Sequence, residues 1–233
     1  MNKYSEKIFL DFKRFHQKHK KLAFQRINLF FGEQKIEFYE AKRLEYESDK
    51  IPKDSIENKI RQSWVTTIGA TLEKIVELLI EDFCAENNLR FTSDKKLKKI
   101  NLESELDLVK RKVLIHFDEY SLLPDGDIII YRMIDKNPDV LAIISVKNSF
   151  RERYTETPYW KLKLLQSDVT KSIVVFMVTP DKDDEISFSA NPRKARIVME
   201  YELDGVYLAK EDFDRSKKIK NISELVDDLK RLV

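Results

Sequence analysis

The sequence predicts an α/β fold in which a mixed central sheet is flanked by helices and preceded by an N-terminal helical region. Three observations support this prediction. Residues 4–86 carry apolar side chains at helical spacing, short apolar runs separated by turn formers follow residue 88, and helical segments lie among these runs. We expect residues 1–54 to form the helical region and residues 55–233 to form the core domain.

The first part of the chain is expected to be helical. Residues 4–50 show helical spacing, with an interruption expected at residues 29–32, where the apolar pattern breaks before Gly32. Pro52 marks a boundary, and Asp54 and Ser55 are candidate N-cap residues for a long amphipathic helix that ends near residue 86. The apolar stripe of this helix is predicted to contain Val65, Ile68, Leu72, Ile75, Leu79 and Phe83.

Strands are predicted from short apolar runs in the second part of the chain, at residues 114–117, 127–131, 140–146 and 173–178. The last two runs lack polar alternation, which is typical of central strands that are covered on both faces. A helix is expected between them at residues 158–168. Residues 196–208 are predicted to form a hairpin around Asp204-Gly205, and residues 221–233 a closing helix with Ser223 as its N-cap.

Composition limits the class of protein. The chain has 233 residues and 42% hydrophobic residues, so it can bury a sizeable core. Its 43 basic and 41 acidic residues leave a net charge of +2, which neither supports nor excludes a nucleic-acid partner. Cys84 is the single cysteine, so a cysteine-rich zinc site is excluded, and a buried thiol is expected. The sequence shows no apolar run of membrane-spanning length, and a cytoplasmic protein without a membrane partner is expected.

Charged residues at two strand ends form a candidate catalytic site. Asp125 and Asp127 open one apolar run, while Ser145 and Lys147 close the next. If these strands are antiparallel neighbours, the acids and the lysine meet at one edge of the sheet. Carboxylates can hold Mg²⁺, and an ammonium group can orient a water for attack on a phosphodiester. The alternative is a common Pro-Asp-Gly turn and a solvated lysine at a strand end.

A cluster of Arg151, Glu152 and Arg153 follows the lysine. Arginine can bond to O6 and N7 of guanine, and glutamate can accept a hydrogen bond from N4 of cytosine. The cluster is therefore a candidate element for reading G·C pairs in the major groove. The alternative is a solvated, charged helix N-terminus.

Pro124-Asp125 followed by Ser145-Val146-Lys147 resembles the PD-(D/E)XK nuclease motif. Ser145 stands where that family usually has an acid. This variant, together with Arg-Glu-Arg shortly after the lysine, is similar to the CCGG subgroup of type II restriction endonucleases. The resemblance covers roughly residues 69–160, and it implies a restriction-endonuclease-like core.

The activity implied by the resemblance is Mg²⁺-dependent hydrolysis of both strands of double-stranded DNA at a short, G·C-containing palindrome. A homodimer is implied, and a cognate DNA methyltransferase would act on the same site without binding stably. Asp125, Asp127 and Lys147 would be catalytic, with the two acids as metal ligands.

The acid that replaces Ser145 is expected from elsewhere in the chain. The subgroup places a glutamate about a dozen residues beyond the lysine, where this sequence has Trp160; Glu156 lies one turn earlier. Glu73 is the stronger candidate for a catalytic and metal-binding role, because residues 69–77 resemble the first core helix of the nuclease fold. A flanking acid of this kind can equally be a simple boundary residue.

Two other functions remain open at the level of sequence. The chain could be a repair or recombination nuclease of the same fold that recognises DNA structure. It could also be a DNA-binding module that has lost its activity, as Ser145 in the motif would allow.

Overall fold

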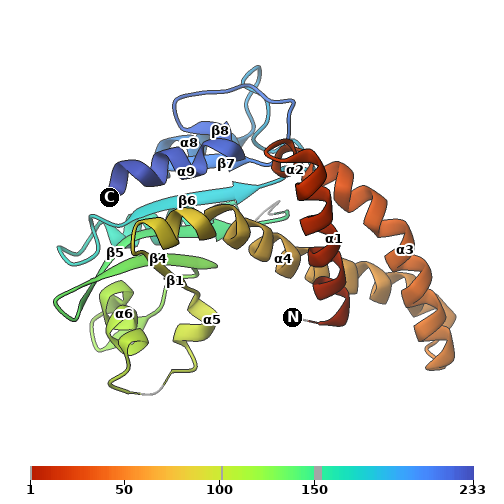
Figure 1. Cartoon of the computed structure of the whole chain (residues 1–233), viewed down its shortest axis with the longest axis horizontal. Helices are drawn as coiled ribbons and strands as arrows, with labels where there is room; N and C mark the ends of the chain where they lie inside the picture. Colours follow the sequence, from red (N-terminus) through yellow and green to blue (C-terminus); the bar gives the residue numbers. More distant parts are fainter. Residues whose placement is uncertain (1, 101, 150–153) are drawn as a thin grey trace.

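A mixed sheet of six strands forms the centre of the molecule. The computed structural model describes residues 2–100, 102–149 and 154–233. The strands lie in the order β1 (Arg90–Thr92), β4 (Ile128–Ile134), β5 (Asn137–Val146), β6 (Val174–Thr179), β7 (Gly205–Leu208) and β8 (Ile219–Asn221). The β1–β4 and β4–β5 pairs are antiparallel, and the pairs from β5 to β8 are parallel. The predicted α/β class with a mixed sheet is confirmed (Figure 1).

The central strands are apolar on both faces because a hydrophobic core lies on each side of the sheet. In β5, Ile144 belongs to one core and Ile143 to the other, and in β6 the same holds for Phe176 and Val175. Successive residues of a strand point to opposite faces, so both sets must be apolar. The predicted runs at residues 127–131, 140–146 and 173–178 are confirmed as strands with slightly different bounds.

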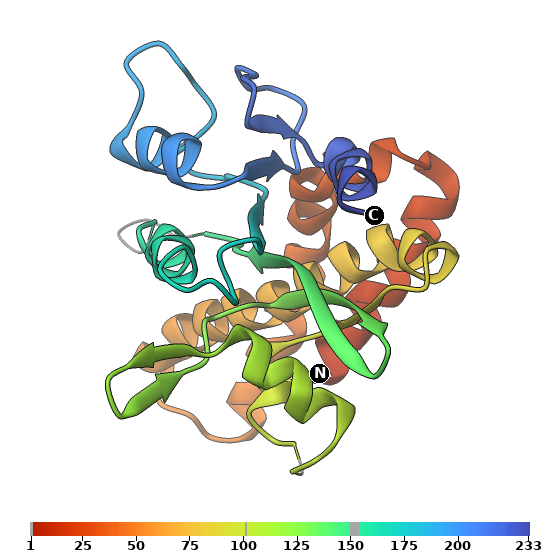
Figure 2. The same cartoon turned by 90° about the vertical axis from the view of Figure 1, so that its left-hand side faces the viewer.

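Helices cover both faces of the sheet. One core joins it to α4 (Lys53–Glu86) and α9 (Leu225–Leu229), and the other joins it to α6 (Glu105–Val113), α7 (Glu156–Leu164) and α8 (Lys194–Glu202). In Figure 2, the teal α7 and light-blue α8 lie on one side, and the dark-blue α9 lies on the other. The predicted run at residues 114–117 forms β2 (Ile115–Phe117), which pairs with β3 (Tyr120–Leu122) in a separate two-stranded sheet. A short helix, α5 (Asp94–Leu97), precedes α6.

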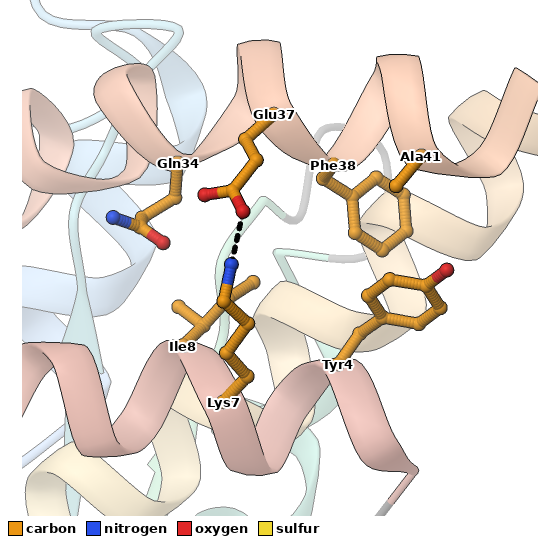
Figure 3. Close-up of a pocket in the computed structure, with 7 residues that line it drawn as sticks. All are labelled: Tyr4, Lys7, Ile8, Gln34, Glu37, Phe38 and Ala41. Atoms are coloured by element: carbon orange, nitrogen blue, oxygen red, sulfur yellow. Dashed lines mark hydrogen bonds and ion pairs between the residues drawn. The ribbon is translucent and has the colours of Figure 1, made fainter.

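The N-terminal region consists of α1 (Lys3–His19), α2 (Leu22–Gln25) and α3 (Ile27–Ser48), of which α1 and α3 pack against α4. Between α1 and α3, the rings of Tyr4 and Phe38 meet edge to face at 5.1 Å, and Lys7 pairs with Glu37 (Figure 3). The cavity beside them measures only about 30 Å³. That volume suits ordered water, so this contact is a filled helix interface and no ligand site.

The interruption expected at residues 29–32 is wrong. Helix α3 continues through it, and the chain changes direction earlier, around Lys20 and Arg26. Phe30 and Phe31 are buried in the core, and a side chain at Gly32 would meet nothing within 4 Å. Burial of the aromatic pair therefore outweighs the low helix propensity of glycine.

The hairpin predicted at residues 196–208 is also wrong. Residues Lys194–Glu202 form α8, whose buried Ala195 and Met199 are four residues apart, at helical spacing. The Asp204 backbone N–H then donates to the Val175 carbonyl, and the Val175 N–H donates to the Asp204 carboxylate at 2.7 Å. These hydrogen bonds place the start of β7 beside β6, and the two strands run parallel. Asp204 and Gly205 therefore lie between the crossover helix α8 and β7, and they do not form a hairpin turn.

Three smaller expectations are corrected at helix ends and on α4. Helix α4 begins at Lys53 after Pro52, and Ser55 lies in its first turn, where its hydroxyl donates to the Pro52 carbonyl. Val65 is 54% exposed and does not belong to the buried stripe. The closing segment is divided into η2 (Ile222–Glu224), α9 and η3 (Lys230–Leu232), and its cap is Asn221 instead of Ser223.

The helix predicted at residues 158–168 is present as α7, with an earlier start and end. Among the described residues, no helix is both long enough and apolar enough to cross a membrane.

Candidate active site

The start of β4 and the end of β5 bring Asp127 and Lys147 together. The strands are antiparallel neighbours with Ile128 opposite Ile144, so residue 127 lies beside the last residues of β5. The Val146 N–H donates to Asp127 Oδ2 at 2.8 Å. Lys147 Nζ lies 3.9 Å from the same oxygen. The sheet thus places one acid and one ammonium group together, where β4 begins and β5 ends. The side chain of the acid is only 14% exposed.

Asp125 is held apart from this pair. Its carboxylate is 42% exposed and lies 3.7 Å from Lys98 Nζ. Between the two acids, the Gly126 carbonyl accepts a hydrogen bond from the Asp94 N–H. A Cβ on Gly126 would lie 2.9 Å from Ile143 Cγ2, so a glycine is needed for the close approach of the two strands. The Pro-Asp-Gly sequence therefore also has a structural reason.

Glu73 reaches the same edge from α4. Its two carboxylate oxygens accept hydrogen bonds from Lys95 Nζ at 2.7 and 2.9 Å, and the same ammonium lies 4.0 Å from Asp127 Oδ1. Glu77, one turn later on α4, pairs with Lys74. Of Glu73 and Glu77, it is Glu73 that is joined to Asp127 through a shared cation.

Glu156 and Ser145 contribute to the opposite side of Lys147. Glu156 is the first residue of α7, and its Oε2 lies 3.8 Å from Lys147 Nζ. Ser145 is 1% exposed, and its hydroxyl accepts a hydrogen bond from Thr157 Oγ1 at 3.0 Å. Ser145 therefore ties β5 to α7, and Lys147 lies between the carboxylates of Asp127 and Glu156.

Burial and charge shift the acid–base properties of this cluster. Burial is the main cause that raises the pKa of Glu73 above its usual value, and the neighbouring Asp127 charge adds to it, while the hydrogen bond from Lys95 opposes it. Burial likewise raises the pKa of Asp127, although the Lys147 charge and the Val146 N–H favour its ionised form. Two partly desolvated carboxylates beside each other attract a cation strongly.

A divalent metal fits this pair of acids. Mg²⁺ is commonly held by one or two carboxylates together with water and substrate phosphate oxygens. Glu73 and Asp127 already share one cation, the Lys95 ammonium, which marks where a positive charge is favoured. Within the described ranges, no group of three or more His, Cys, Asp or Glu side chains is placed to hold a metal.

Inspection of the sequence did not single out Lys95. It lies in α5, in a segment that follows β1, and it reaches the site because β1 pairs with β4. No spacing rule relates it to residues 125–147, so no local signal could have identified it. The Arg151-Glu152-Arg153 cluster lies outside the described residues; Ser149 and Tyr154 are the described residues on either side of that gap.

Comparisons with known proteins define the class of this chain. Residues 105–228 match the family described as "BsaWI restriction endonuclease type 2". The chain is 45% identical over 206 residues to a Methanocaldococcus jannaschii protein named "Putative type II restriction enzyme MjaVIP", with 87% of this chain and 91% of that protein covered. It is 51% identical over 167 residues to "Probable type II restriction enzyme HpyAORF263P" of Helicobacter pylori, with 72% and 86% covered.

A solved structure titled "Crystal structure of pre-specific restriction endonuclease BsaWI-DNA complex" aligns with 100% of this chain and 93% of its own, at 14% identity and a TM-score of 0.44. The family match extends over more than half of the 233 residues, and both relatives are well above 30% identical. The chain therefore belongs to the BsaWI family of type II restriction endonucleases. The matched range includes Asp125, Asp127 and Lys147, whereas Glu73 lies before it.

Proposed function

We propose that this chain is a Mg²⁺-dependent type II restriction endonuclease of the PD-(D/E)XK type. It hydrolyses both strands of double-stranded DNA at a short, G·C-containing palindromic site and works as a homodimer. The observation that carries the proposal is the meeting of Asp127, Glu73 and Lys147 at one edge of the sheet, with distances of 3.9 and 4.0 Å from Asp127 to the two flanking ammonium groups.

In this mechanism, Asp127 and Glu73 hold the metal. Mg²⁺, when bound, lowers the pKa of a water and offsets the charge that develops on the phosphate. Asp127 is the stronger candidate for a direct ligand, because its carboxylate is fixed by the Val146 N–H. Asp125 matches the motif but faces Lys98, and from there it contributes negative charge at longer range.

Lys147 positions the attacking water. Its ammonium is held between Asp127 and Glu156, at 3.9 and 3.8 Å, so its place is set before substrate arrives. From there it can donate one hydrogen bond to the water and another to a phosphate oxygen. The water oxygen bonds to phosphorus as the scissile P–O bond breaks. Ser145 takes the position of the usual acid and supports the site by anchoring α7.

Sequence reading is assigned to Arg151, Glu152 and Arg153. The two arginines would contact guanine and the glutamate would contact cytosine in the major groove. In the sequence, this cluster begins two residues after Ser149 and ends shortly before α7. In a symmetric dimer, two such elements would read the two halves of a palindrome, and each subunit would cut one strand.

The decisive experiment incubates the protein with plasmid DNA and Mg²⁺ and sequences the fragment ends. Discrete ends at one palindromic sequence are expected, and chelation of the metal should stop cleavage. Lys147→Ala should lower the cleavage rate by at least about 10²-fold, the effect of losing one preorganised charge contact, with DNA binding retained. The control is Lys171→Ala, an exposed lysine that pairs only with Asp168 among the described contacts.

Three outcomes would contradict the proposal. Cleavage of DNA by the Lys147→Ala variant at the natural rate would refute the catalytic role of Lys147. Ends that follow junctions or flaps irrespective of sequence would point to a structure-specific nuclease. Tight DNA binding without cleavage in Mg²⁺ or Mn²⁺ would point to an inactive binding module.

A further inference from the structure

One face of α4 carries a strip of two polar residues, a glycine and an acid that leads toward the candidate active site. Gln62, Thr66, Gly69 and Glu73 are separated by four, three and four residues, so they lie along the same side of the helix. Gln62 and Thr66 are exposed, whereas Gly69 and Glu73 are partly covered. The strip therefore runs from open surface to the acid that shares a cation with Asp127.

A groove lies beside the exposed end of this strip. It measures about 470 Å³ and is lined by Arg61, Gln62, Val65, Thr66 and Ser149. Ser149 comes two residues after Lys147, so the groove connects α4 with the catalytic end of β5. Figure 1 shows the N-terminal half of α4 extending beyond the sheet toward α1 and α3.

The same helix borders a second hollow of about 320 Å³, which shares Gln62 and Thr66 with the groove and is also lined by Lys59 and Ser63. Each hollow is bordered by polar side chains and one long basic side chain, together with Tyr46 in the second hollow and Val65 in the groove. Side chains of these types supply most protein contacts to the phosphates of DNA.

Gly69 has no explanation within the described chain. Glycine destabilises the middle of a helix relative to alanine, and α4 extends well beyond Gly69 in both directions. A Cβ at this position would meet nothing within 4 Å, and its φ is not positive. Neither packing nor backbone conformation therefore requires a glycine here. A missing side chain does allow the backbone of another molecule to approach the helix closely.

We propose that the α4 strip and the groove beside it bind the sugar–phosphate backbone of the substrate DNA, with Gly69 as the point of closest approach. The inference rests on the proposed function, because a DNA strand bound along the α4 strip would reach the Glu73–Asp127–Lys147 cluster. Arg61 and Lys59 supply positive charge, and Gln62, Ser63 and Thr66 supply hydrogen-bond donors. A second copy of the chain is a poorer occupant, because the core of a protein interface is apolar, whereas four of the five described residues that line the groove are polar or charged.

The test compares Gly69→Leu with Gly32→Leu. Gly32 is a matched control, because it also lies within a long helix and a Cβ added there would meet nothing within 4 Å. Both variants should fold with thermal midpoints no lower than that of the natural chain, since leucine favours helix more than glycine does. A fluorescently labelled short duplex of mixed sequence, without metal, serves as the probe. Gly69→Leu should weaken binding by at least about tenfold, the effect of losing charge-assisted contacts, and Gly32→Leu should not change it.

A second variant tests the charge. Arg61→Gln should lower the slope of log affinity against log salt concentration by about one, as expected for one lost phosphate contact. Arg132→Gln is the control, because Arg132 pairs with Asp139 at the opposite end of β4.

Two results would overturn the inference. One is duplex binding by Gly69→Leu that equals that of the natural chain. The other is a change in oligomeric mass of Gly69→Leu without a change in duplex affinity, which would assign the strip to a contact between copies. Because these measurements use no metal and no cleavage, failure of plasmid cleavage would contradict the proposed function alone.

Discussion

Asp127 lies between two lysines that differ in their surroundings. Lys147 is 21% exposed and is held by Asp127 and Glu156, whereas Lys95 is 60% exposed and bridges Glu73 and Asp127. Burial would lower the pKa of Lys95, but the hydrogen bond from it to Glu73 and the nearby acidic charges raise that pKa overall. Lys95 therefore stays charged and keeps two acids together that would otherwise repel each other.

Lys95→Met should tighten divalent-metal binding at this site by about two- to fivefold, the size of one exposed ion pair. The substitution removes the ammonium that competes for the carboxylates of Glu73 and Asp127. Calorimetric titration with Ca²⁺ measures the affinity, and the Ca²⁺-dependent rise in thermal midpoint should also be larger than in the natural chain.

Lys96→Met is the matched control, since Lys96 is exposed on the same short helix and no ion pair of its side chain is found in the described part of the chain. Equal Ca²⁺ affinities for the Lys95 and Lys96 variants would show that Lys95 does not compete with the metal.

At the scale of elements, one carboxylate ties the C-terminal helix α9 to the sheet in addition to its buried leucines. Asp228 of α9 accepts hydrogen bonds from the Tyr207 hydroxyl of β7 and from Lys220 of β8, both at 2.6 Å. Burial acts to raise the pKa of Asp228, but the hydrogen bonds from Lys220 and Tyr207 outweigh it and hold the pKa below its ordinary value of 3.8.

This lowered pKa gives a pH-dependent contribution to stability. The native state favours the ionised carboxylate, so the contribution is complete above the ordinary pKa of 3.8 and is lost as the pH falls through the lower native value. Asp228→Asn should therefore lower the urea midpoint at neutral pH, and the difference from the natural chain should shrink in acid. Urea titrations across this range measure the effect.

Asp227→Asn serves as the control for this prediction. Asp227 is 65% exposed and pairs with Lys230 on the same segment, so its removal should change the urea midpoint little at any pH. A deficit of Asp228→Asn that stays constant down to the lowest pH would argue against the assigned linkage.

At the scale of the whole molecule, several elements that are distant in the sequence meet at one end of strands β4 and β5. Asp127 before β4, Lys147 after β5, Glu156 at the start of α7 and Glu73 of α4 are linked there by ion pairs, the last through Lys95. The N-terminal helices lie beside the far end of α4, and Figure 2 shows them on the same side of the sheet as α9. Under the proposed function, one such site would cut one strand, and cleavage of a duplex would require two copies of the chain.

Analytical ultracentrifugation should find two chains bound to one palindromic duplex, since a two-fold axis relates the two half-sites to two subunits. The free Arg151→Ala variant should have the same mass as the free natural chain. In competition binding, however, the variant should lose the preference for G·C-containing sites. A complex with one chain per duplex would refute the dimer, and an unchanged preference for G·C sites would refute the reading role.

Much of the sheet could be predicted from the sequence for a simple reason. Strands buried on both faces need apolar side chains at every position, and the runs that become β5 and β6 show this pattern directly. The antiparallel pairing of β4 and β5 needs only a short turn, so the meeting of Asp127 with Lys147 followed from local order along the chain.

Other features could not be predicted locally. Residues 194–202 carry apolar side chains that fit a strand or a helix equally well. They form the helix α8 because its buried side chains pack on the sheet. Helix α3 passes through residues 29–32 because Phe30 and Phe31 are buried by neighbouring helices. In both cases long-range packing outweighs local propensity.

The sequence by itself determined the layered α/β architecture and the meeting of Asp127 with Lys147. Both follow from the periodicity of apolar residues and from the pairing of strands that are adjacent in the sequence. Only the tertiary structure decided which acids share a site. Glu73 arrives on α4 and Lys95 through the pairing of β1 with β4, while Asp125 turns away to Lys98. Such contacts depend on how distant elements pack, and no spacing in the sequence records that packing.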